Sequence, residues 1–209
     1  MSDCCGGDSC APQATDRRRS RTLKAVLGIN AVMFGVELAA GLVIGSVALL
    51  ADSLDMLGDA LTYGVSLAVV GGTLHRRARA ALLKGLIMAG SGLFVLGQTV
   101  YRAWLPELPA AAPMGAVALL ALAANLVCFA LLWRHRGEDI NMRSVWLCSR
   151  NDLLANTGVM AAAAAVALTG SPWPDLVAGT LIAGLFLKTA GSVLKEALQQ
   201  LRVPSPGAL

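Results

Sequence analysis

The sequence predicts an all-α integral membrane protein, a bundle of six transmembrane helices. Of its 209 residues, 56% are hydrophobic and 14% are charged, whereas a soluble domain carries about 25% charged residues. The charged residues cluster in short islands, and the apolar runs between them are roughly twenty residues long, enough to cross a hydrocarbon core of about 30 Å. Lipid is therefore the expected solvent for most side chains, and a chain in lipid must satisfy its backbone hydrogen bonds internally.

The apolar segments follow one another in a regular order. A Cys- and Arg-rich tail is predicted over residues 1–22, a six-helix transmembrane domain over 23–202 and a short tail over 203–209. The expected helices are 23–42, 49–73, 81–102, 114–132, 144–168 and 176–193, with an amphipathic continuation to residue 202. Charged islands separate the second from the third and the fourth from the fifth. A proline-bracketed loop, 106–113, follows the third, and a Gly-Ser-Pro-Trp-Pro run precedes the sixth.

The placement of basic residues predicts the topology. Lys and Arg precede the first helix, occupy the second and fourth connections and follow the sixth helix. They are Arg17, Arg18, Arg19, Arg21 and Lys24; Arg76, Arg77 and Arg79; Arg134, Arg136 and Arg143; and Lys195 and Arg202. The positive-inside rule then places both termini in the cytoplasm, and six spans require the same. Trp104 and Trp173 fall at the expected outer interface, where amphipathic rings are favoured.

The second helix carries acids where lipid should surround it. Asp55 and Asp59 are four residues apart, so they share one face of the helix. A carboxylate near the bilayer centre costs about 2.5 to 3.5 kcal/mol on insertion scales, and two like charges also repel unless a cation or a proton intervenes. This pair predicts ion handling. Asp52 lies nearer the outer surface and is either an interfacial charge or part of an ion pathway.

The fifth helix repeats the same spacing. Cys148 lies four residues before Asp152, and Asn156 four residues after it. Two helices that each present two donors can enclose one ion tetrahedrally, as zinc prefers. Carboxylate with thiolate suits zinc or cadmium and disfavours magnesium or calcium. Two alternatives remain open: the thiol is a small buried apolar group, or Asn156 replaces it as the ligand.

With these motifs the chain resembles the cation diffusion facilitator family of divalent metal transporters. The resemblance is strongest over residues 37–52, through Asp59, and again over residues 148–159. It implies a transport site of Asp55, Asp59 and Asp152, with Cys148 at the position where the family usually has His. It also implies an antiparallel helix bundle, a homodimer and proton-coupled export. We expect a short form without the family's C-terminal cytoplasmic domain or its His-rich loop.

Further candidate groups lie outside these two pairs. Cys4, Cys5 and Cys10 place three thiols within seven residues, which either capture a soft cation or are incidental. Glu37, an acid inside the first helix, either handles protons or ions or packs against Asn30 or a neighbouring polar group.

The predicted function is efflux of a divalent transition-metal ion, zinc or cadmium foremost and cobalt as a further candidate, in exchange for protons by alternating access. No cofactor, enzymatic activity or nucleic-acid partner is expected; the expected partners are the metal ion, protons, the bilayer of a bacterial inner membrane and a second copy of the chain. The alternatives are a membrane metal sensor and an intramembrane aspartyl protease with Asp59 and Asp152 as its dyad. The additional acids on the second helix argue against such a dyad.

Overall fold

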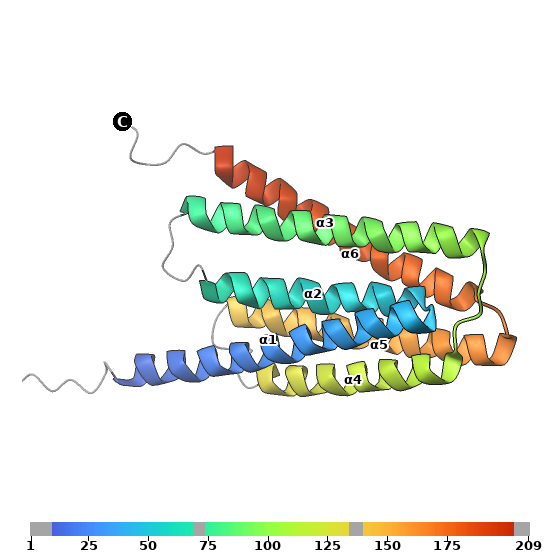
Figure 1. The fold of residues 1–209 in the computed structure, drawn as a ribbon. Helices are drawn as coiled ribbons and strands as arrows, with labels where there is room; N and C mark the ends of the chain where they lie inside the picture. The colour runs from blue at the N-terminus through green and yellow to red at the C-terminus, as the bar shows by residue number, and fades with distance from the viewer. Residues whose placement is uncertain (1–9, 69–73, 134–139, 203–209) are drawn as a thin grey trace, which may run out of the picture.

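The computed structural model describes residues 10–68, 74–133 and 140–202, and within these ranges it contains six α-helices and no strand. The all-α prediction is confirmed (Figure 1). The helices are α1 (Cys10–Ile44), α2 (Val47–Ala68), α3 (Leu74–Trp104), α4 (Ala111–Trp133), α5 (Ile140–Thr169) and α6 (Trp173–Arg202).

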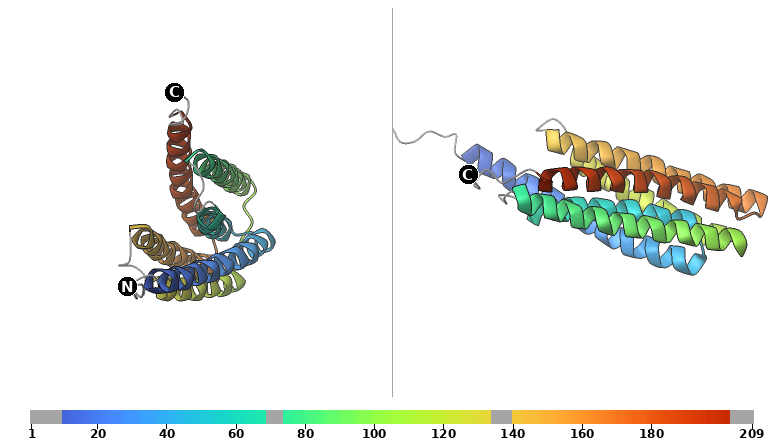
Figure 2. Two further views of the ribbon diagram at one scale, coloured as in Figure 1. Left: turned by 90° about the vertical axis from the view of Figure 1, so that its left-hand side faces the viewer. Right: turned by 90° about the horizontal axis from the view of Figure 1, so that it is seen from above.

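The helices pack as neighbours around α2. The closest pairs are α3 with α6, α1 with α2 and α4 with α5, while α2 also contacts α3, α5 and α6. Seen along the bundle, α3 and α6 stand to one side and α1, α4 and α5 to the other, with α2 between them (Figure 2). The helix α2 is therefore enclosed by protein on several sides.

Most helices extend beyond the apolar segments that predicted them. Hydropathy marks only the part of a helix that lies in lipid, whereas Arg, Lys and Gln are good helix formers and continue it. Accordingly α1 begins at Cys10 within the predicted tail, and α6 continues to Arg202. The predicted proline loop ends early, because Pro113 lies in the first turn of α4, where a missing N–H is tolerated.

Among the described residues, five helices contain a stretch long and apolar enough to cross a membrane by length and composition. These stretches are Arg21–Ile44, Ala78–Trp104, Ala111–Trp133, Asp152–Thr169 and Trp173–Gln199. The remaining predicted span, α2, carries Asp52, Asp55 and Asp59 within its 22 residues. Large apolar side chains are exposed along the bundle, among them Val43 at 88% and Leu168 at 87%. An apolar surface of this extent is suited to lipid.

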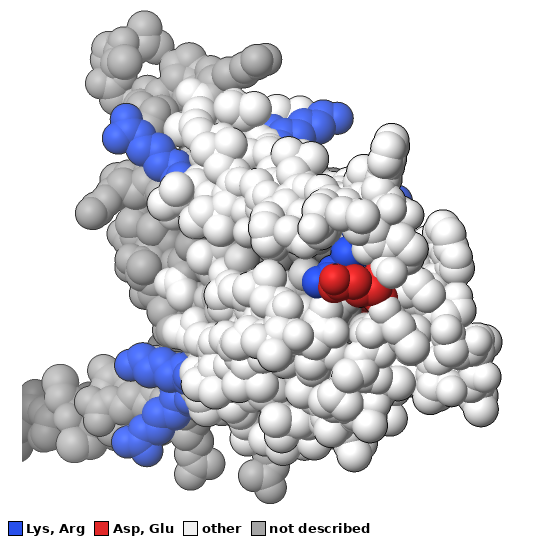
Figure 3. Space-filling model, turned by 45° about the vertical axis from the view of Figure 1, so that its right-hand side comes forward, with Lys and Arg blue, Asp and Glu red and all other residues white. Residues whose placement is uncertain are grey.

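The two ends of the bundle carry different sets of charged side chains. The end that holds the α1–α2 turn, here called the Gly45 end, also contains the α3–α4 and α5–α6 connections (Figure 1). Arg21, Lys24 and Arg79 are exposed toward the opposite end. On the face drawn in Figure 3, acidic side chains gather at one place beside basic atoms, and other basic side chains lie apart from them.

The start of α2 is fixed by an acid from α6. Asp175 is 1% exposed, and its carboxylate accepts hydrogen bonds from Ser46 Oγ at 2.6 Å, Val47 N at 2.7 Å and Ala48 N at 3.0 Å. Ser46 Oγ in turn accepts from Leu49 N at 3.1 Å. The first N–H groups of α2, which have no partner inside the helix, are thus satisfied, and the negative charge lies at the favourable helix end.

The turn before this cap requires glycine. Gly45 has φ +82°, a conformation that costs side-chain-bearing residues energy, and its N–H donates to Gly41 O at 3.0 Å. A Cβ on Gly45 would also lie 2.5 Å from Arg102 Nη1. Arg102 lies in the last turn of α3, and its guanidinium lies 3.6 Å from Glu107 Oε2. The Gly45 end therefore links α1, α2, α3 and α6.

Replacing Asp175 by Ala should destabilise the bundle, because it leaves the first N–H groups of α2 buried without partners. Each such group costs about 1–3 kcal/mol, so the thermal unfolding midpoint in detergent should fall by several degrees. Glu107→Gln is the matched control, since its carboxylate is 81% exposed and a surface pair contributes about 0–1 kcal/mol. Equal midpoints for Asp175→Ala and the control would contradict the capping role.

Candidate metal site

The predicted ligands lie where α2 crosses α5. Asp59 and Asp152 face each other from these two helices, close enough for their carboxyl groups to share a hydrogen bond when one of them holds a proton. Asp55, one turn away on α2, interacts electrostatically with both. All three side chains are half-buried. The structure therefore brings together the three carboxylates that sequence predicted, from two helices.

Asp59 is held in place by neighbouring polar groups. The Tyr63 hydroxyl, one turn further along α2, donates to Asp59 Oδ2 at 2.9 Å, and its ring is 2% exposed. Lys84 of α3 acts electrostatically on Asp59 and donates to Thr62 Oγ1. These groups orient one carboxylate and offset part of the negative charge, a supporting role like that of outer-shell partners at metal sites.

The carboxylates are adjacent but do not form a closed cage. Among the residues with described side chains, no three His, Cys, Asp or Glu groups are arranged to hold a metal ion. Like-charged carboxylates repel when no cation lies between them, so ligation requires their side chains to reorient. Cys148 lies on α5 one turn before Asp152, and its side chain is outside the described residues.

Asn156 is hydrogen-bonded to Asp52. Its Nδ2 donates to Asp52 Oδ1 at 3.3 Å and to the Asp152 backbone oxygen at 3.0 Å. Both Asn156 and Asp52 are fully buried. Asp52 is therefore enclosed by protein, and its part in an ion pathway stays a prediction. The amide points to the next acid along α2, one turn toward the Gly45 end.

Glu37 of α1 joins this region as well. It is fully buried, and the charged groups that act on it are Asp52 and Asp55. Asn30 itself is engaged elsewhere, since its Nδ2 donates to Val26 O at 3.0 Å and to Cys128 Sγ at 3.9 Å. The polar groups near Glu37 are Asp52 and Asp55. Asn30 is two turns away along α1, too far along the helix to reach the Glu37 carboxylate.

The predicted metal capture by the tail cysteines falls outside the described side chains. Cys4 and Cys5 lie outside the described residues, and Cys10 begins α1 with its side chain undescribed.

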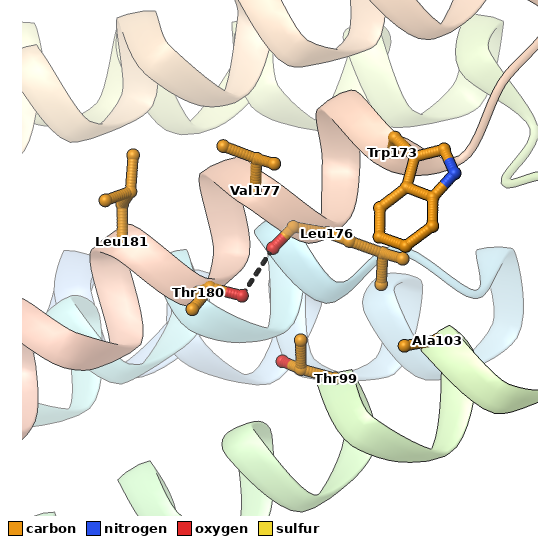
Figure 4. Close-up of a pocket in the computed structure, with 7 residues that line it drawn as sticks. All are labelled: Thr99, Ala103, Trp173, Leu176, Val177, Thr180 and Leu181. Atoms are coloured by element: carbon orange, nitrogen blue, oxygen red, sulfur yellow. Dashed lines mark hydrogen bonds between the residues drawn. The ribbon is translucent and has the colours of Figure 1, made fainter.

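The pocket of Figure 4, between α3 and α6, is separate from the acids. It is lined by apolar residues and two threonines, and the Thr180 hydroxyl is engaged with Leu176 O at 2.6 Å.

Comparison with known proteins finds relatives among metal transporters. The chain is 32% identical to a zinc transporter (ZitB) of Pectobacterium atrosepticum, over 93% of this chain and 65% of that protein. It is 26% identical to a metal cation efflux system protein (CzcD) of Cupriavidus metallidurans, over 87% of this chain and 61% of the relative. It is 26% identical to a cadmium, cobalt and zinc/H(+)-K(+) antiporter of Bacillus velezensis, over 88% of this chain and 64% of the relative.

The chain thus spans less than two thirds of the length of these relatives. The model of the cation efflux transmembrane domain matches residues 23–202, which coincides with the predicted transmembrane domain and includes every acid described above. The chain therefore belongs to the cation efflux family and contains the family's transmembrane domain.

Proposed function

We propose that this chain binds a divalent transition-metal ion between α2 and α5 and exports it across the membrane in exchange for protons. The observation that carries the proposal is the contact between Asp59 and Asp152, two carboxylates brought together from different helices of a transmembrane domain. Buried like charges of this kind are expensive in a membrane and mark ion pathways.

Zinc and cadmium are the foremost candidates, and cobalt is a further one. In the proposed site, Asp55, Asp59 and Asp152 supply oxygen and Cys148 supplies sulfur, a mixed donor set that suits these borderline and soft ions. The printed names of the relatives, which include a zinc transporter and a cadmium, cobalt and zinc antiporter, support the same class of ion. The metal is the substrate, and the proposal requires no resident cofactor.

Protonation supplies the coupling. Only deprotonated carboxylates and thiolates ligate a metal well, so metal entry releases protons and protons displace the metal. A neutralised site is cheaper to bury than a charged one, which favours the change between inward and outward states when metal or protons are bound. Alternating access around a site within the bilayer follows, and the antiporter named among the relatives supports it.

The proposed orientation has both termini in the cytoplasm of a bacterial cell. The exposed Arg21, Lys24 and Arg79 lie toward one end of the bundle, and such residues favour the cytoplasmic side. Arg102 lies at the other end, where Glu107 and Asp175 offset its charge. Resemblance to the family supports a homodimer. The sensor and protease alternatives find no support in the relatives, whose names describe transport and efflux.

Zinc accumulation in proteoliposomes tests the exchange directly. With an acidic lumen, protons leaving the vesicle should drive zinc uptake, and a protonophore should collapse it. Asp59→Asn should reduce uptake at least tenfold, because it removes one ligand charge and replaces a carboxylate oxygen by an amide NH2 that cannot bind a metal. Glu107→Gln, an exposed acid outside the site, should transport like the wild type. Zinc uptake that is equal with and without the pH gradient would overturn proton coupling.

Cys148→Ser tests the thiol. Sulfur ligands favour soft ions, so the substitution should reduce cadmium flux more than zinc flux, by roughly tenfold or more for cadmium. Cys128→Ser is the comparison for loss of a second buried thiol near the site, because Cys128 packs with Val26, Tyr63 and Leu132 and interacts electrostatically with Asp59 and Asp152. A ligand role for Cys148 requires that Cys148→Ser lower cadmium flux more than Cys128→Ser does. Unchanged cadmium and zinc flux in Cys148→Ser would show that the thiol does not bind the metal.

A further inference from the structure

A second group of buried polar side chains lies beside the proposed transport site. It consists of Glu37 of α1, Asp52 of α2 and Asn156 of α5, and is called here the Glu37 group. Asp52 precedes Asp55 by three residues, about 4.5 Å along the helix axis toward the Gly45 end. Asn156 follows Asp152 by one turn of α5 in the same direction. The Asn156–Asp52 contact of 3.3 Å joins α2 and α5 at this level.

The Glu37 group is rich in oxygen atoms without partners. Glu37 Oε1 and Oε2, Asp52 Oδ2 and Asn156 Oδ1 are all buried, and none has a hydrogen-bond partner within the described part of the chain. Buried polar atoms are normally satisfied, and buried carboxylates are costly when they are not. The Asn156 amide donor is already used by Asp52 and the Asp152 backbone.

Every one of these atoms is an electron-pair donor. The charges that act on Glu37 come from Asp52 and Asp55, and the charge that acts on Asp52 comes from Asp55. Because the charged groups that act on these carboxylates are themselves acids, a positive ion is the ligand that would offset their charge. Two carboxylates and an amide oxygen match the charge of one divalent ion and the donors that hard or borderline ions accept.

We propose that Glu37, Asp52 and Asn156 form a second, oxygen-only site for the divalent cation, one helix turn from the transport site toward the Gly45 end. The proposal rests on the proposed transport function and adds a step to it. An ion leaving the Asp55, Asp59, Asp152 and Cys148 ligands would meet donors without sulfur, which hold zinc or cadmium less tightly. Weaker binding along the path favours release, because conduction requires sites that an ion can leave.

Manganese(II) is the probe for this site, because it prefers oxygen ligands and its binding can be followed by electron paramagnetic resonance. The experiment uses the full chain in detergent, with Asp59→Asn and Cys148→Ser combined to weaken the transport site. This background should still bind one manganese ion. Adding Glu37→Gln, which keeps the size and removes the charge, should weaken manganese binding at least tenfold.

Asp52→Asn in the same background should weaken manganese binding to the same extent. Agreement between the two variants would exclude local misfolding caused by Glu37→Gln alone. Adding Glu107→Gln, which changes an exposed acid in the same way, should leave binding unchanged. If the background binds no manganese, or if Glu37→Gln and Asp52→Asn leave its binding unchanged, the second site is wrong.

The two proposals fail separately. Glu37→Gln alone should still bind zinc at the transport site with an affinity within about threefold of the wild type, while zinc flux falls. Wild-type protein that neither binds nor transports zinc would overturn the transport function. Normal zinc flux in Glu37→Gln would overturn only the second site.

Discussion

The bundle depends on how α2 is held, because this helix carries the acids and touches four of its neighbours. Asp175 of α6 binds the first N–H groups of α2 and the Ser46 hydroxyl, which fixes the height of α2 relative to α6. Close packing reinforces this position, since a Cβ on Gly179 would lie 2.6 Å from Val47 Cγ1. A shift of α2 by one residue would rotate its aspartates by about 100° and separate Asp59 from Asp152.

The acids form two levels along α2 and α5 with different chemistry. At the first level Asp55, Asp59 and Asp152 meet, and Cys148 follows the same face of α5. At the second, Asp52 and Asn156 meet and Glu37 approaches from α1. In the two proposed sites donor softness falls from the first level to the second, so the levels should differ in how tightly they hold a soft ion. A graded path of this kind allows both capture and release.

Sequence periodicity predicted much of this and missed what depends on contacts between helices. Four-residue spacing places Asp55 with Asp59 on one face of α2, and Cys148 with Asp152 on one face of α5. From these two faces the contact between α2 and α5 could be predicted. The same spacing placed Asn156 equally well as a ligand beside Asp152, because a face of one helix does not reveal its partner. Asp175 falls just before the apolar segment 176–193 that marks the sixth helix, and hydropathy alone does not reveal that it caps α2, although Pro174 beside it signals a first helical turn. Tyr63 lies four residues after Asp59, a spacing that identifies a partner once that acid is singled out.

The most direct test of the central claim is the zinc K-edge X-ray absorption spectrum of protein loaded with one zinc ion. Cys4, Cys5 and Cys10 are replaced by serine, which removes the tail thiols as competitors. Ligation by Cys148 and the three aspartates predicts one sulfur at about 2.3 Å and oxygen atoms at about 2.0–2.2 Å. A first shell of oxygen alone, or one with two or more sulfur atoms, would contradict a site formed by Asp55, Asp59, Cys148 and Asp152.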